Sequence, residues 1–203
     1  MRKYLNLAMS LAIFLLFIVP SVASANQITL KAVLPEYYPG SNVIIKTGDV
    51  LYSSKTFGTS TQIVGHIAIV ASDLRVYHVN PADDGAGSGG KADALYNYFG
   101  RHGKGETIKV YRAAHGSKAA AWAKDNYNKV TNYSIPIFSW NDFKLGTINP
   151  NYCSKFIWQA FYYGNSNTDY IIGYYTPSKE AYVTPAQIID SSDLTYAGSF
   201  ITP

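Results

Sequence analysis

The sequence predicts an α+β domain in which an antiparallel sheet packs against a few helices. Short runs rich in β-branched and aromatic residues, at 42–53, 66–71, 74–78 and 107–113, are typical of strands. The two middle runs are joined by Ser72-Asp73, which predicts a hairpin. Helical patterns are interleaved with these runs, so the chain combines both kinds of element in one fold.

The remaining elements follow from local signals. A strand is expected at 28–33, a Gly- and Asp-rich loop at 81–91, a short helix at 94–99 and irregular chain at 132–150. Ser117 is expected to cap a helix that runs to about Val130. A later helix begins at Cys153 with Asn151 as N-cap and ends near Gly164. A last helical turn, with Pro at its first position, runs from 184 to 189.

The N-terminus has the three parts of a secretory signal peptide. Arg2 and Lys3 supply the positive start, residues 11–19 are almost continuously apolar, and Ala23-Ser24-Ala25 offers a cleavage site. The apolar run is shorter than the roughly 20 residues of a spanning helix, which disfavours an uncleaved anchor. We therefore expect a signal peptide at residues 1–25, one domain at 26–203, a secreted or extracytoplasmic location, and no stable membrane insertion after cleavage.

Charge and cysteine usage narrow the function classes. The chain has 17 basic and 13 acidic residues, a net charge of +4 that falls to about +2 without Arg2 and Lys3. No clustered basic face is evident, so a nucleic-acid partner is not expected. Cys153 is the single cysteine and cannot form an internal disulfide. A lone thiol in an exported protein is either buried in a core or used in chemistry.

The candidate catalytic residues are Cys153, His66 and His78. A thiol attacks carbonyls as thiolate, and a helix start together with a neighbouring imidazole favours that anion. A two-residue turn would place His66 opposite about position 79, so a slightly longer turn would bring both histidines onto one face. A zinc site is the competing use of these side chains, but no short-spaced ligand pair supports a metal, and no cofactor is expected. His102 and His115 lie in Gly-flanked sequence and are left outside the predicted site.

Three segments in order resemble the core of the NlpC-type cell-wall peptidases: Gly48-Asp49-Val50-Leu51, Gly65 to Val70 with its histidine, and Val76-Tyr77-His78. In that family the cysteine comes first, whereas here Tyr152-Cys153-Ser154 comes last. The chain therefore resembles the circularly permuted, papain-fold branch of YaeF/YiiX-like amidases over roughly residues 47–195. One departure is Lys155, where that branch often has an acidic residue.

The resemblance implies a cysteine amidase or peptidase that works through a thioacyl enzyme. Cys153 would be the nucleophile, His66 the base and His78 its orienting partner, with the Cys153 amide and Tyr133 as oxyanion donors. Export favours cell-wall peptides as substrates. Two alternatives stay open: a lipid acyl hydrolase or acyltransferase of the lecithin-retinol acyltransferase-like type, which shares the His, His, Cys order, and a non-catalytic binding domain.

Overall fold

The structure, a computed structural model, describes residues 36–54, 65–81, 87–136, 143–168 and 171–203. Its strands are β1 (Val50–Ser53), β2 (His66–Val70), β3 (Arg75–Asn80), β4 (Gly89–Ala94), β5 (Thr107–Arg112) and β6 (Thr195–Ile201). Its helices are α3 (Leu95–His102), α4 (Gly116–Asn126), the 3-10 turn η3 (Tyr127–Lys129), α5 (Cys153–Gly164) and α6 (Pro185–Ile189). The strands form one antiparallel sheet in the order β4-β3-β2-β1-β5-β6. The predicted α+β class, an antiparallel sheet packed against helices, is confirmed.

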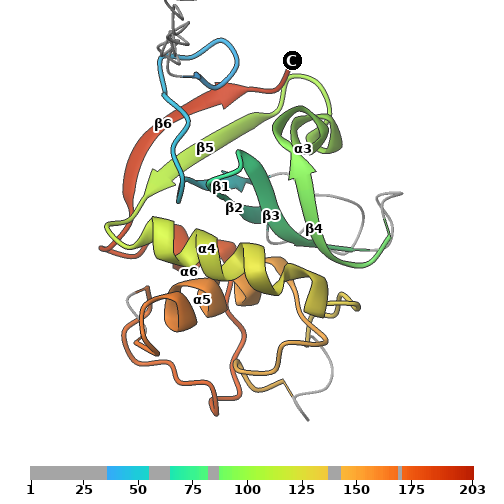
Figure 1. Cartoon of the computed structure of the whole chain (residues 1–203), viewed down its shortest axis with the longest axis vertical. Helices are drawn as coiled ribbons and strands as arrows, with labels where there is room; N and C mark the ends of the chain where they lie inside the picture. The colour runs from blue at the N-terminus through green and yellow to red at the C-terminus, as the bar shows by residue number, and fades with distance from the viewer. Residues whose placement is uncertain (1–35, 55–64, 82–86, 137–142, 169–170) are drawn as a thin grey trace, which may run out of the picture. The chain divides into compact units, whose positions relative to one another are not determined.

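Both faces of the sheet are covered, and the alternation of side chains along β2 shows how. Ile67 and Ile69 face the larger apolar cluster, which contains α4, α5 and α6. Ala68 and Val70 face the smaller cluster, which contains the side chains of α3. Figure 1 shows α4, α5 and α6 together on one side of the sheet and α3 on the other. Every residue of β2 is buried, because the strand lies in the middle of the sheet.

The β2–β3 hairpin has the longer turn that brings the two predicted histidines onto one face. Ala71 donates its N–H to the Arg75 carbonyl, so the turn contains three residues, with Leu74 at a positive φ of 58°. The ladder consists of the pairs Ile69–Tyr77 and Val70–Val76, next to the turn. Beyond these pairs β2 and β3 separate, on the side where His66 and His78 lie.

The predicted loop at 81–91 is partly wrong, because Gly89–Ala94 form the edge strand β4. The reason is a close backbone approach that the glycines permit. A Cβ atom on Gly90 would stand 1.9 Å from the Tyr127 carbonyl oxygen, and Gly90 N–H donates to the Val130 carbonyl. The segment therefore packs against η3 as a strand, although its composition is typical of a loop.

Two predicted caps are also wrong. Ser117 lies inside α4, whose N-cap is His115, and Tyr152 rather than Asn151 is the N-cap of α5. The predicted turn after Thr184 is confirmed, since Thr184 and Gln187 form a capping box. Strand β6 was not predicted, and the part of 42–53 that forms a strand is β1. The strand predicted at 28–33 lies outside the described residues.

Among the residues that the structure describes, no helix is long and apolar enough to span a bilayer.

Candidate active site

Cys153 is the first residue of α5, and side chains on both sides of it fix the start of this helix. Tyr152 precedes it in extended conformation, and its N–H donates to the Asn151 side chain at 2.9 Å. Asn151 in turn donates its side-chain N–H to the Gln159 side-chain oxygen, eight residues further along, at 2.7 Å. The thiol is 1% exposed and belongs to the larger apolar cluster. The nucleophile predicted from sequence therefore stands at a rigid, buried helix start.

The neighbours of Cys153 also hold the segment that follows α5. The Val183 N–H donates to the Tyr152 hydroxyl at 3.1 Å, and the Ser154 hydroxyl donates to the Val183 carbonyl at 2.7 Å. These two bonds satisfy both backbone polar groups of Val183 from the residues on either side of the cysteine. The chain at 182–184 is thereby fixed against the thiol.

His66 and His78 lie together at the separated ends of β2 and β3. Their rings are perpendicular, with His66 Nε2 3.1 Å from His78 Nδ1, and both side chains are fully buried. By strand alternation they face α3, whereas Cys153 comes from α5 on the other face of the sheet. The backbone N–H of Ile67, the residue after His66, is within hydrogen-bonding reach of the Cys153 sulfur. The structure thus brings His66 and His78 together and places the Cys153 sulfur next to the residue that follows His66, where the two strands diverge.

The hydrogen-bond chain continues to two residues that were not predicted. His78 Nε2 is 2.8 Å from Asp93 Oδ2, and the Arg101 guanidinium holds both oxygens of that carboxylate, at 2.6 and 2.9 Å. Burial opposes ionisation of Asp93, but the hydrogen bonds from His78 and Arg101 outweigh it and hold the pKa of this carboxyl well below its usual range. Asp93 is therefore a carboxylate at neutral pH.

This carboxylate determines which ring nitrogens carry protons. An ionised Asp93 can only accept, so His78 must donate from Nε2 and its Nδ1 holds a lone pair. That lone pair accepts from His66 Nε2–H, which leaves the His66 lone pair on Nδ1. The protonation pattern of three residues thus makes His66 Nδ1 the basic atom of the site.

The resting site is neutral rather than an ion pair. Burial raises the pKa of the Cys153 thiol to about 11, and backbone N–H groups of Ile67 and Ser154 offset only part of this shift. Burial and the neighbouring His78 lower the pKa of His66 well below its usual value. The expectation that the helix start enriches the thiolate is therefore wrong for the resting state, because desolvation exceeds the dipole effect.

Two residues of α3 complete the wall around the histidines. The Tyr98 ring lies 5.2 Å from His78 and 6.1 Å from His66, and the His102 ring lies 6.0 Å from His66. His102 was left outside the predicted site because the glycines around it suggested a loop, whereas it is the last residue of α3. Burial, with a smaller contribution from His78, lowers its pKa to about 3. This third imidazole is neutral at physiological pH.

Tyr133, the predicted second oxyanion donor, forms a parallel bridge with Asn151, two residues before the nucleophile. Its N–H donates to the Ser88 hydroxyl at 2.6 Å. Its role stays a prediction.

Lys155 is buried beside the Pro150 carbonyl, at 3.3 Å, and burial lowers its pKa to about 8. Within the described part of the chain, no three His, Cys, Asp or Glu side chains are grouped to hold a metal ion.

Two known proteins are similar to this chain. An uncharacterised 30.3 kDa protein of Bacillus thuringiensis is 29% identical over 164 residues, which are 77% of this chain and 57% of that protein. The chain thus spans a little over half the length of this curated relative. The crystal structure of YiiX from Escherichia coli O157:H7, described as a metalloprotein, covers 76% of this chain and 97% of YiiX, with 15% identity and a TM-score of 0.47.

A family model described as lipoprotein N-acylation protein, LnsA-like, matches residues 7–195. This match supports an acyl hydrolase or acyltransferase in general, and it gives cell-wall peptide cleavage no support. The circular permutation relative to NlpC-type enzymes is not tested by these comparisons and stays a prediction. Because the match covers nearly the whole sequence, the chain belongs to the LnsA-like lipoprotein N-acylation family.

Proposed function

We propose that this protein is a cysteine acyltransferase that moves an acyl chain from a phospholipid ester to the amino group of a lipoprotein, through a thioester on Cys153. The observation that carries the proposal is the hydrogen-bonded chain from Asp93 through His78 to His66, beside a thiol at the start of α5. The family description supplies the acceptor, the amino group of a lipoprotein, and the phospholipid ester is the donor that we add. Both remain proposals for this chain.

In the first half-reaction, the Cys153 sulfur attacks the ester carbonyl while His66 Nδ1 takes the thiol proton. The positive charge then on His66 is stabilised through His78 by the Asp93 carboxylate. Collapse of the tetrahedral intermediate breaks the ester C–O bond, and His66 returns the proton to the departing alkoxide. The products are a lysophospholipid and an acyl thioester on Cys153.

In the second half-reaction, a neutral amine attacks the thioester carbonyl and gives a proton to His66. The C–S bond breaks, and the sulfur of Cys153 takes the proton back as the amide leaves. Burial of the thiol, which is 1% exposed, supports transfer over hydrolysis because an enclosed thioester is shielded from water. The backbone N–H of Cys153 is the proposed oxyanion donor, with Tyr133 as a candidate for the second.

The cellular setting is part of the proposal. A phospholipid donor and a lipoprotein acceptor are both anchored in a membrane, and the signal-like segment at residues 1–25 would deliver the chain to its extracytoplasmic side. The enzyme would then act on that membrane surface without a cofactor.

Amide hydrolysis in cell-wall peptides is the second candidate. The order of the Gly-Asp turn, the two histidines and the cysteine supports it, and both reactions pass through a thioester on Cys153. The two functions differ in the bond that forms the thioester, a peptide amide for the amidase and a phospholipid ester for the transferase. They also differ in the acceptor, which is water for the amidase and an amine for the transferase.

One reconstitution separates these functions. Full-length protein is mixed with phospholipid vesicles that carry a heavy-isotope acyl chain and with a diacylated lipopeptide that has a free α-amine. The proposal predicts the heavy acyl chain on the amine by mass spectrometry, and a transient mass increase of one acyl group on Cys153. The Cys153→Ala protein is the blank. Free labelled fatty acid without acylated lipopeptide would mean a hydrolase, and cleavage of peptidoglycan peptides without acyl transfer would favour the amidase.

A further inference from the structure

The segment after α5 places aromatic side chains in a row from the nucleophile to the protein surface. Burial and the nearby Cys153 sulfur raise the pKa of the Tyr182 hydroxyl to about 12. The Tyr182 ring lies 5.3 Å from Tyr152, whose hydroxyl pKa is raised by burial and by Tyr182, Cys153 and Tyr175. Tyr175 packs on Tyr174 with ring centroids 4.7 Å apart. The row therefore begins at the thiol and ends at Tyr174.

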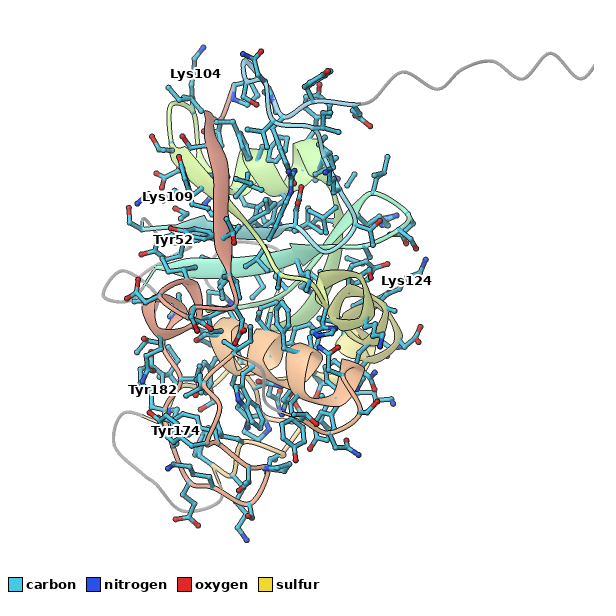
Figure 2. All side chains as sticks on the ribbon, turned by 90° about the vertical axis from the view of Figure 1, so that its left-hand side faces the viewer. Tyr52, Lys104, Lys109, Lys124, Tyr174 and Tyr182 are labelled. Atoms are coloured by element: carbon cyan, nitrogen blue, oxygen red, sulfur yellow. The ribbon has the colours of Figure 1, made fainter. Side chains whose placement is uncertain are left out.

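The outer end of this row is exposed and carries a cation. Tyr174 is 67% exposed, and the Lys179 ammonium lies over both outer rings, 5.2 Å from the Tyr174 centroid and 4.6 Å from that of Tyr175. Lys144 is exposed and forms an antiparallel bridge with Glu180, so the described residues of this surface include two lysines and one carboxylate. Figure 2 shows Tyr174 and Tyr182 on the same side of the molecule, away from Lys124 on α4.

Backbone hydrogen bonds fix this surface to the helix of the nucleophile. Leu145 donates to the Lys179 carbonyl at 3.0 Å and Gly146 donates to the Pro177 carbonyl at 2.8 Å. Gln159 of α5 holds the same strand-like stretch through the Leu145 and Thr147 carbonyls, at 2.6 and 2.9 Å. The tyrosines thus keep a set position relative to Cys153.

We propose that Tyr174, Tyr175, Lys179 and Tyr182, which we call the tyrosine surface, are the site where the protein docks on an anionic phospholipid bilayer to take its acyl donor. Tyrosine suits the bilayer interface because its ring is apolar and its hydroxyl is polar, and lysine adds attraction to lipid phosphates. The net charge, +4 for the whole chain and about +2 without Arg2 and Lys3, acts in the same direction. The inference rests on the proposed function, since it names the route of the donor to Cys153.

The single cysteine makes a direct test possible, and this test needs no enzyme activity. Cys153→Ala removes the only thiol. Adding either Tyr174→Cys or Tyr96→Cys then creates one labelling position for a polarity-sensitive fluorophore. Tyr96 is the matched control, because it is 70% exposed and lies on α3, on the opposite face of the sheet from α5. The full chain is used with phosphatidylglycerol vesicles.

The Tyr174 label is expected to shift to the blue and brighten on vesicles, while the Tyr96 label does not change. Lys179→Ala should weaken the response about fivefold, and added salt should weaken it as well. Residues 11–19 could bring the chain to vesicles by themselves, so the position of the responding label decides the outcome. Equal responses from the two labels, or none from Tyr174, would overturn the proposal.

A kinetic comparison relates the surface to the reaction. Tyr174→Ser should raise the apparent KM for vesicle donor roughly three- to tenfold, with no change on a soluble short-chain thioester, and Tyr96→Ser should change neither. If the labels respond but no acyl transfer occurs, the docking surface stands and the proposed function fails. If acyl transfer occurs while Tyr174→Ser and Tyr96→Ser behave alike, the function stands and the docking surface is wrong.

Discussion

Replacement of Asp93 by Asn tests the hydrogen-bond chain at its far end, away from the reacting atoms. The amide keeps the size of the carboxylate but removes its charge and one acceptor. In the native protein Arg101 donates to both carboxylate oxygens. The NH2 group of the new amide must therefore face either the guanidinium or His78, and each of these is itself a donor. If it faces His78, the protonation pattern of both imidazoles reverses and His66 Nδ1 is no longer the base.

The size of the effect follows from the hydrogen-bond distances along the chain. Asp93 lies 2.8 Å from His78, which lies 3.1 Å from His66. With the intervening ring, the carboxylate is roughly 8 Å from His66 Nε2, where two unit charges attract by about 2 kcal/mol at an effective dielectric constant of about 20. Exchanging a charge-assisted hydrogen bond for a neutral one adds about 1 kcal/mol. The value of kcat/KM for acyl transfer should therefore fall roughly 30- to 150-fold.

The assay is the heavy-acyl transfer to lipopeptide, with rates normalised to the concentration of protein that melts cooperatively. Asp73→Asn is the matched control, because Asp73 also binds a tyrosine and a cation, Tyr77 and Lys124, but lies at the turn end of the hairpin. It should change kcat/KM less than twofold. A loss for Asp93→Asn that equals the loss for Asp73→Asn would refute the argument that the carboxylate acts through His78.

Four further outcomes are expected. Cys153→Ala and His66→Ala should each abolish acyl transfer, and the double variant should be no worse than either single variant. His78→Ala should retain part of the rate, and an active His66→Ala enzyme would exclude His66 as the base. Iodoacetamide should alkylate Cys153 more slowly than a free thiol at pH 7, because burial raises its pKa to about 11, and a faster rate measured by mass spectrometry would contradict the neutral pair. The pKa of His102 in the folded protein is lowered to about 3, so between pH 6.5 and 3 the unfolded chain binds one more proton than the folded one. The free energy of unfolding should therefore fall by up to about 1.4 kcal/mol for each unit by which the pH is lowered in this range. His102→Asn should reduce that slope in denaturant titrations, and an unchanged slope would exclude this histidine as its source. Intact-mass analysis of the exported protein should find Asn26 as the first residue, and a chain that begins at Met1 would refute cleavage.

The candidate catalytic residues could be selected from the sequence because they carry local signals. Cys153 stands at a helix start, and His66 and His78 occupy short strands rich in β-branched residues. Their pairing depended on turn length, which the sequence limits to two or three residues, and the three-residue turn with Leu74 gives the shared face.

Asp93 could not be predicted in the same way, because its strand is hidden by glycines. The register pairs His78 with Lys91 and Val76 with Asp93, so the aspartate is the diagonal cross-strand neighbour of His78. That relation exists only once Gly89–Ala94 is recognised as a strand, and the recognition depends on the contact between Gly90 and Tyr127. The neutral state of the thiol was missed for a related reason, since burial is a property of the packed molecule.

The candidate nucleophile and base come from opposite sides of the sheet, Cys153 from the side of α5 and His66 from the side of α3. Cys153 depends on the docking of α5, while the Asp93–Arg101 pair depends on β4 and α3. If α5 on one face, or β4 and α3 on the other, are not packed on the sheet, the chain still has its thiol and its imidazoles, but they are not positioned to react together. Under the proposed function, acyl transfer therefore begins only when both layers have docked. Acyl transfer is in this sense a readout of complete folding, and a destabilising change in either layer should lower activity before it lowers the amount of sheet.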